Sequence, residues 1–256
     1  MKKFNTKFGA NRSGQLLIVA ALAIAILISS TTIYVYELSK SPISPETQEV
    51  SSFIIASKQC LKNAVISSLA NISNGGVKTI LTENLDKLSL VFRNLTFPAL
   101  CNLNYTPLND LNYDNGVWLS WDDGGFGVSS AHVNLTLNVR GLSENVTVEY
   151  AVNITTTLIV SGYYTLVGDE KQVNLSCKLY NEGQPALTKN LTAFYLDVDG
   201  WRIVDESNSL SVGDYGNGTY SISFVVNIPS QNVEVSAHFY DMRDIFVRAN
   251  TTCPEA

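Results

Sequence analysis

The sequence has few of the residues that most active sites use. Its 256 residues include only two histidines and four cysteines. No Gly-x-Ser-x-Gly, His-Glu-x-x-His or phosphate-binding glycine loop occurs, and no Cys-x-x-Cys or cysteine–histidine spacing is typical of zinc. His132 and His238 both lie in alternating stretches, where a histidine is usually a surface or packing residue. We expect a protein that is not an enzyme and that uses no cofactor.

Basic residues are also few. Four of the 17 lie in a short head, at Lys2, Lys3, Lys7 and Arg12, so the remaining 13 are set against 23 acidic residues, a net charge of −10. An acidic surface without a basic run argues against nucleic acid and against anionic lipid as partners. The simplest interpretation of this charge is solubility.

The stretch 16–36 contains no charged residue at all. As a helix it would span roughly 31 Å, about the thickness of a bilayer core. The basic head before it predicts a single transmembrane helix over 16–36, with residues 1–15 cytoplasmic and the rest of the chain extracellular, anchored in the cytoplasmic membrane. A cleaved secretory signal is the alternative for this segment.

The residues just before this stretch, Arg12-Ser13-Gly14-Gln15, resemble the processing site of archaeal type IV pilin-like proteins. The resemblance implies cleavage between Gly14 and Gln15, and it implies copies of this chain or other pilin-like subunits as partners. Many such pilins carry a glutamate at the fifth mature position, where this chain has Val19. A filament subunit and a singly anchored surface protein therefore both stay open.

Asn-x-Ser/Thr sequons are more frequent than chance predicts. With 24 asparagines, chance would give roughly four or five sequons, and the chain has eleven. Asn11 lies in the head, and Asn104 is set apart because Pro107 follows its Thr106. A sequon is an acceptor on an exposed surface of an exported protein, so the excess agrees with the expected topology. The predicted N-glycosylation sites are Asn71, Asn94, Asn134, Asn145, Asn153, Asn174, Asn190, Asn217 and Asn250.

The four cysteines all follow the expected span, and they allow three pairings. Their spread favours one disulfide in each half of the ectodomain, Cys60–Cys101 and Cys177–Cys253. Each closure would contribute about 4 kcal/mol as an upper figure.

Hydrophobic periodicity divides the ectodomain in two. Helical spacing over 50–69 and 80–91, interrupted at Asn74-Gly75-Gly76, gives way to period two from Val117. The alternating stretches 132–139 and 145–150 predict a hairpin that is polar on one face. We therefore expect a pilin-like α+β domain over 37–153.

Residues 154–256 contain six candidate strands, at 155–166, 172–180, 191–198, 219–228, 232–239 and 245–251. Short strands with regular turns are typical of an immunoglobulin-like sandwich. Gly216-Asn217-Gly218-Thr219-Tyr220 also resembles the start of a strand in Ig-like modules of prokaryotic surface proteins. The expected fold class is α+β: a transmembrane helix, a helical stalk with an antiparallel sheet, then an all-β Ig-like sandwich.

Two clusters could form binding sites. Asp110, Asn112 and Asp114 have the alternation of a Ca²⁺ loop, but the same residue types are what an ordinary turn requires. Trp118, Trp121 and Phe126 surround acidic turn residues, where aromatics can stack on sugars or pack into a core.

These features together predict a non-enzymatic archaeal cell-surface glycoprotein. It would be a pilin-like subunit or an anchored protein for adhesion or assembly. The alternative is a membrane-anchored ectodomain that binds a solute or a glycan.

Overall fold

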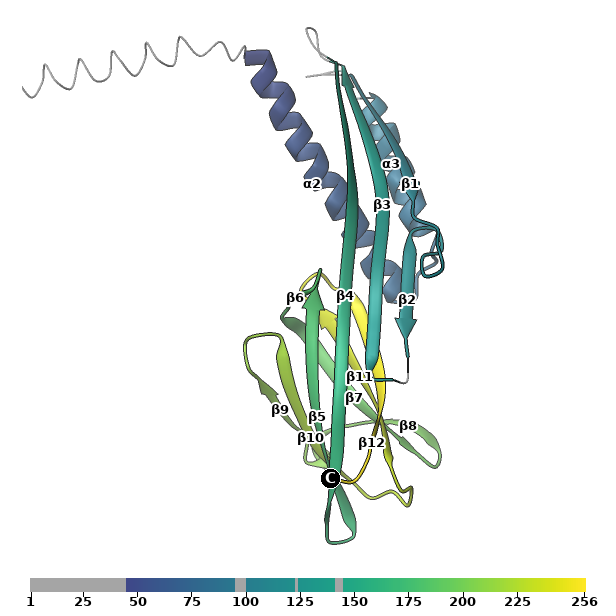
Figure 1. Cartoon of the computed structure of the whole chain (residues 1–256), viewed down its shortest axis with the longest axis vertical. Helices are drawn as coiled ribbons and strands as arrows, with labels where there is room; N and C mark the ends of the chain where they lie inside the picture. Colours follow the sequence, from purple (N-terminus) through teal and green to yellow (C-terminus); the bar gives the residue numbers. More distant parts are fainter. Residues whose placement is uncertain (1–44, 95–99, 123, 141–144) are drawn as a thin grey trace, which may run out of the picture. The chain divides into compact units, whose positions relative to one another are not determined.

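The computed structural model describes residues 45–94, 100–122, 124–140 and 145–256, with side chains described from Ser51 onward (Figure 1). Over these ranges the chain forms two α-helices, twelve strands and one short 3-10 helix. The helices are α2 (Pro45–Ser73) and α3 (Ile80–Asn94), and the 3-10 helix η1 covers Glu206–Asn208. The strands are β1 (Leu100–Pro107), β2 (Val117–Trp121), β3 (Phe126–Arg140), β4 (Asn145–Val167), β5 (Glu170–Asn181), β6 (Gln184–Pro185), β7 (Thr188–Asp197), β8 (Gly200–Ile203), β9 (Ser211–Asp214), β10 (Thr219–Val226), β11 (Val233–Asp241) and β12 (Phe246–Cys253).

The helices lie where the periodicity predicts them, and glycine separates them. Helix α2 ends at Ser73, and Gly75 then adopts a φ of +97°, a conformation that costs glycine little because it has no Cβ. The Gly76 amide donates a hydrogen bond of 3.0 Å to the Asn71 carbonyl, which closes the turn. Helix α3 then begins at Ile80.

Eight strands form one antiparallel sheet, called sheet A here. Its order is β1-β3-β4-β5-β10-β9, with β2 paired to β3 and β6 paired to β5. Strand β4 has 23 residues and runs beside β3 along one part of its length and beside β5 along the other (Figure 1). It pairs with β3 over 145–159 and with β5 over 156–167, so one strand is common to both halves of the sheet.

A second, four-stranded sheet, called sheet B, has the order β12-β11-β7-β8. Its strands are also antiparallel, and their register aligns outward-facing side chains in rows. His238 of β11 lies opposite Arg248 of β12, and Ser236 lies opposite Phe194 of β7 and Asn250 of β12.

Two hydrophobic cores lie against sheet A. In the first, side chains of the two helices and of Ile245 pack with the first half of the sheet; its fully buried members include Leu61, Val65, Leu69, Leu81, Leu85, Val133 and Leu137. In the second, sheets A and B face each other; its members include Val173, Leu175, Ile222, Phe224, Val235, Phe239 and Val247. A buried side chain of this size contributes about 1.5–3 kcal/mol, whereas an exposed ion pair such as Lys78–Asp114 contributes about 0–1 kcal/mol. These cores therefore hold the layers together.

The expected fold class is wrong. Over the described ranges the chain is mainly β-structure, and its two helices do not form a stalk, since Leu61, Val65 and Leu85 are completely buried in the first core. Residue 154, where a separate sandwich was expected to begin, lies in the middle of β4. The alternating pattern of β4 continues from Asn145 to Val167 with one glycine, Gly162, and no proline, so no turn interrupts the strand there.

The transmembrane helix expected over 16–36 lies outside the described residues. None of the helices that the structure describes is long and apolar enough to cross a membrane.

Candidate functional site

Five sequon asparagines lie on the outer face of sheet A, the face turned away from both cores. They are Asn104 in β1, Asn134 in β3, Asn145 and Asn153 in β4, and Asn174 in β5, and we call this surface the sequon face. Alternate residues of a strand point to the same side, so the Ser or Thr two positions later lies on that side as well. Four of these asparagines are exposed, and Asn174 is half-buried.

The strand register brings neighbouring sequons side by side. Asn104 lies opposite Thr136, and Asn134 lies opposite Thr106, so these two asparagines are diagonal neighbours on β1 and β3. Diagonal neighbours on adjacent strands are about 7–8 Å apart. The sequence predicts which asparagines are acceptors, but only the register shows that these two are neighbours.

The remaining predicted acceptors are scattered. Asn190 on β7 and Asn217 in the turn before β10 are exposed. Asn71 on α2 is exposed, but its sequon residue Ser73 is buried and accepts a hydrogen bond from the Phe246 amide. Exposed Asn94 ends α3 and its threonine lies outside the described residues, whereas Asn250 on β12 is half-buried.

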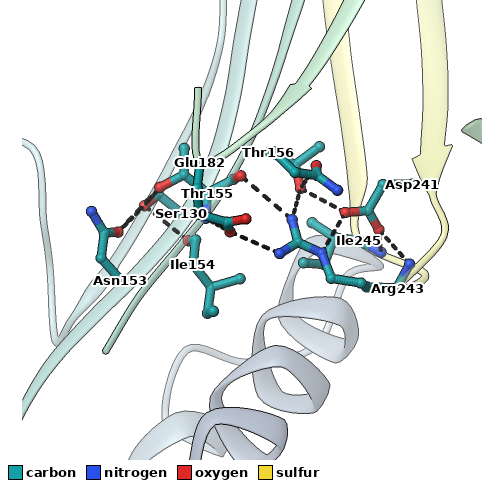
Figure 2. A network of polar contacts seen from close by, with 10 residues as sticks. Ser130, Asn153, Ile154, Thr155, Thr156, Glu182, Asp241, Arg243 and Ile245 are labelled. Atoms are coloured by element: carbon teal, nitrogen blue, oxygen red, sulfur yellow. Dashed lines mark hydrogen bonds and ion pairs between the residues drawn. The ribbon is translucent and has the colours of Figure 1, made fainter. Parts of the chain in front are cut away.

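A polar network joins sheet A to the turn between β11 and β12 (Figure 2). The completely buried Asp241 carboxylate accepts hydrogen bonds from the Arg243 Nε and the Thr156 hydroxyl, at 2.8 and 3.0 Å. It also accepts bonds from the backbone amides of Arg243 and Ile245, at 2.8 and 2.9 Å. The Arg243 guanidinium reaches across to Glu182, at 2.7 Å.

The charged groups of this network stabilise one another. Burial by itself lowers the pKa of Arg243, but the bonds to Glu182 and Asp241 outweigh burial and raise it. Every carboxylate oxygen of Asp241 is bonded within the network. These bonds tie β4 to the β11–β12 turn, whereas the Glu182 side chain at the edge of the network is 43 % exposed.

The outer face of sheet B is different, because it is hollowed and carries aromatic side chains. A hollow of about 210 Å³ is lined by Phe194, Trp201, Ser236, His238, Arg248 and Asn250. An adjoining hollow of about 310 Å³ shares Trp201 and Asn250 with it and adds Glu234. We call the two together the sheet B groove.

Arg248 is the charged residue that lines the first hollow, whereas Glu234 lines the adjoining one. The Arg248 guanidinium lies 5.2 Å from the centre of the Trp121 ring. The neighbouring His238 stacks on Phe194 with ring centres 4.5 Å apart, and its Nε2 lies 3.0 Å from the Ser236 hydroxyl. Burial, together with the charge of Arg248, lowers the pKa of His238 to about 4, so this ring is neutral at physiological pH.

The aromatic cluster identified in the sequence is divided between the two faces. Trp121 donates a hydrogen bond to Ser129 and packs edge-on against Phe246, and its ring lies against the Arg248 guanidinium. Trp118 instead stacks edge-on with Tyr113, which also contacts His132 on the outer side of sheet A. Sequence reasoning missed Trp201 and Arg248, because their partners lie on other strands.

The residues proposed for calcium take part in turn contacts. Asp110 accepts hydrogen bonds from the amides of Asn112 and Tyr113, which lower its pKa, and Asp114 pairs with Lys78 at 2.9 Å. Within the described ranges no group of three or more acidic, histidine or cysteine side chains is placed to hold a metal. These contacts are typical of a turn, and the calcium site stays a prediction.

The two expected disulfides are not formed in the structure, where all four thiols are free. Cys177 of β5 and Cys253 of β12 are nonetheless buried in the same core. Burial raises the pKa of each to about 12, and the charge of Cys253 adds to the effect on Cys177. Cys101 is also buried, with a pKa of about 11, whereas Cys60 is exposed. The pairing of these cysteines stays a prediction.

No model of a protein family matches this chain, and a search of curated proteins finds none that is similar to it. Function must therefore be inferred from the surfaces themselves.

Proposed function

We propose that this chain is a non-enzymatic cell-surface glycoprotein that displays N-linked glycans on sheet A and acts in adhesion or assembly. One observation carries the proposal: the sequons Asn104, Asn134, Asn145, Asn153 and Asn174 share one solvent-facing side of a sheet. The opposite side of the same strands is packed in the cores, so glycans here leave the packing undisturbed.

The chemistry of the sequon face supports display rather than catalysis. Between the sequons it carries further amides and hydroxyls, among them Asn102, Asn138 and Ser161. The buried Asp241 carboxylate is fully occupied by hydrogen bonds, and Arg243 pairs with both Asp241 and Glu182. Both features are consistent with a surface that displays glycans.

Location and assembly belong to the same proposal. N-glycosylation requires export, which is consistent with an ectodomain outside the cytoplasmic membrane. The motif around Gly14 and Gln15 supports a pilin-like origin, with copies of this chain or related subunits as partners. The two facing sheets are compatible with an Ig-like module, a build that suits adhesion without specifying a ligand.

Glycopeptide mass spectrometry of the full chain from its native membranes tests the proposal. We expect a glycan on Asn134, which an Asn134→Gln substitution removes together with its mass. Asn138→Gln is the matched control, because Asn138 lies on the same face of the same strand but in no sequon. Unmodified asparagines at all five positions of the sequon face would contradict glycan display.

A second candidate function, capture of a soluble ligand, is favoured by the sheet B groove. Aromatic and polar groups converge there around hollows that approach the lower end of the range for ligand sites, roughly 300–1,000 Å³. A ligand that binds only the folded state raises the melting temperature with its concentration. A melting screen of neutral and charged sugars and amino acids tests this function, and no shift at millimolar concentration with any of them would exclude it.

A further inference from the structure

The guanidinium of Arg248 has no acidic partner in the described part of the chain. It makes no ion pair there, and its buried Nε has no hydrogen-bond acceptor. A buried donor without a partner is unfavourable, whereas a carboxylate can accept two parallel hydrogen bonds from a guanidinium. This side chain is therefore equipped to receive an anion.

The hollow around Arg248 has the right charge for an anionic ligand. Its lining contains one cation and no acidic residue, while Glu234 lines only the adjoining hollow. His238 is neutral above pH 5 because its pKa is about 4. It can therefore donate or accept a hydrogen bond without adding a second charge.

An exposed aromatic surface completes the hollow. Trp201 on β8 has 47 % of its surface exposed although it lines the same hollow as Arg248. An exposed indole without a full packing partner offers a flat apolar surface, and the amide and hydroxyl of Asn250 and Ser236 lie beside it. A flat apolar surface with hydroxyl-binding groups around it matches a pyranose ring better than a peptide side chain.

We propose that the sheet B groove binds a sugar that carries a carboxylate, such as a uronic acid, with Trp201 against the ring and Arg248 on the carboxylate. The inference gives a ligand class to the second candidate function, and it rests on that function. Binding of this sugar does not depend on glycans at the sequons. A glycan on Asn250 itself, however, would fill the groove and block binding. Such a sugar would come from a free oligosaccharide or from the glycan of a neighbouring surface protein.

The test is titration of the full-length chain at pH 7 with a short oligomer of galacturonic acid, and with the corresponding neutral galactose oligomer. We expect the acidic oligomer to bind at least tenfold more tightly. We also expect higher salt to weaken this preference, because the groove is partly open to solvent.

Two substitutions separate the two contacts. Arg248→Gln should remove the preference for the acidic oligomer, and Trp201→Ala should weaken binding of both oligomers at least tenfold. Lys178→Gln and Tyr215→Ala are matched controls, because both residues are exposed, Lys178 on the outer face of sheet A and Tyr215 in the turn before β10. Unchanged melting temperatures confirm that the variants fold.

Three outcomes would overturn the inference, each in a distinct way. Equal binding of both oligomers, insensitive to Arg248→Gln, would overturn the acidic class and leave a sugar-binding function. Equal binding of free acetate or an acidic peptide would replace the sugar with a simple anion or a peptide. Absence of saccharide binding, with a melting shift from another solute, would overturn the inference but not ligand capture. A glycoprotein from the native source carrying the acidic sugar, if bound in place of the free oligomer, would identify a neighbouring surface protein as the source.

Discussion

The outer faces of sheets A and B belong to the same protein but have opposite chemistry. The sequon face on sheet A carries five sequon asparagines with serine and threonine between them, alongside residues such as His132 and Lys178. The sheet B groove contains Phe194, Trp201, His238 and Arg248 around hollows. The difference shows that alternation decides only which positions of a strand face solvent. The side chains at those positions decide whether the face suits a modification or a ligand.

Besides the core between them, the two sheets are joined through Asp241, which bonds to Thr156 of β4. Replacing Asp241 with alanine should lower the free energy of unfolding by about 3 kcal/mol, since Arg243 then keeps only Glu182 as a charged partner. Urea unfolding monitored by circular dichroism measures this change. Asp244→Asn is the matched control and should change stability by no more than about 0.5 kcal/mol, because the exposed pair with Lys189 contributes little. Equal losses of unfolding free energy in Asp241→Ala and Asp244→Asn would show that the network stabilises the fold no more than an exposed ion pair does.

Lowering the pH should destabilise the folded protein through His238, which lines the sheet B groove. Its pKa of about 4 in the folded protein is below the ordinary 6.5, so the unfolded chain binds the proton first. Its contribution to stability is therefore complete above pH 6.5 and falls as the pH drops toward 4, by about 3 kcal/mol at most and by less if solvent reaches the ring. Thermal melts of the native protein and of His238→Gln from pH 7 to 4 measure it. If the melting temperatures of the two proteins fall in parallel as the pH drops, His238 is not the source of the acid sensitivity.

The cysteines offer a way to link the two sheets covalently. Cys177 lies in sheet A and Cys253 in sheet B, and both thiols are buried with a pKa of about 12. In the folded, reduced protein at pH 8, iodoacetamide should modify Cys60 and leave Cys177 and Cys253 unmodified, as peptide mass spectrometry will show. In a second sample, isolated without reductant and then denatured, modification of all four cysteines means free thiols, whereas protection of Cys177 and Cys253 means that they form a disulfide.

Glycan occupancy should differ between the faces without a measurable change in stability. We expect Asn134 to be modified and Asn250 to be unmodified, because Asn134 is exposed on a flat sheet and Asn250 is half-buried in the groove. Occupancy of Asn104 should rise when Asn134 is replaced by glutamine, since the two are diagonal neighbours. Quantitative glycopeptide analysis measures both, and a modified Asn250 would mean that the groove is not open to a ligand.

Much of the local structure was predictable from the sequence. The positions of the helices, the alternating strands and the glycine turn at Asn74-Gly75-Gly76 all follow from spacing. The shared orientation of Asn134 and Thr136 also follows, because residues two apart on a strand point the same way. The fold class did not follow, since a periodic pattern cannot tell whether β4 belongs to one sheet or to two domains.

The sequence by itself determined the positions of the sequons, the apolar alternation that buries one side of each strand, and the scarcity of catalytic residue types. Only the tertiary structure decided that β4 joins both halves of sheet A, that Asp241 is buried against Thr156, and that Trp201 and Arg248 line one hollow. The physical reason is the distance along the chain between the residues that interact. Side-chain direction is fixed by the local backbone, whereas strand register and sheet packing depend on residues far apart in the chain.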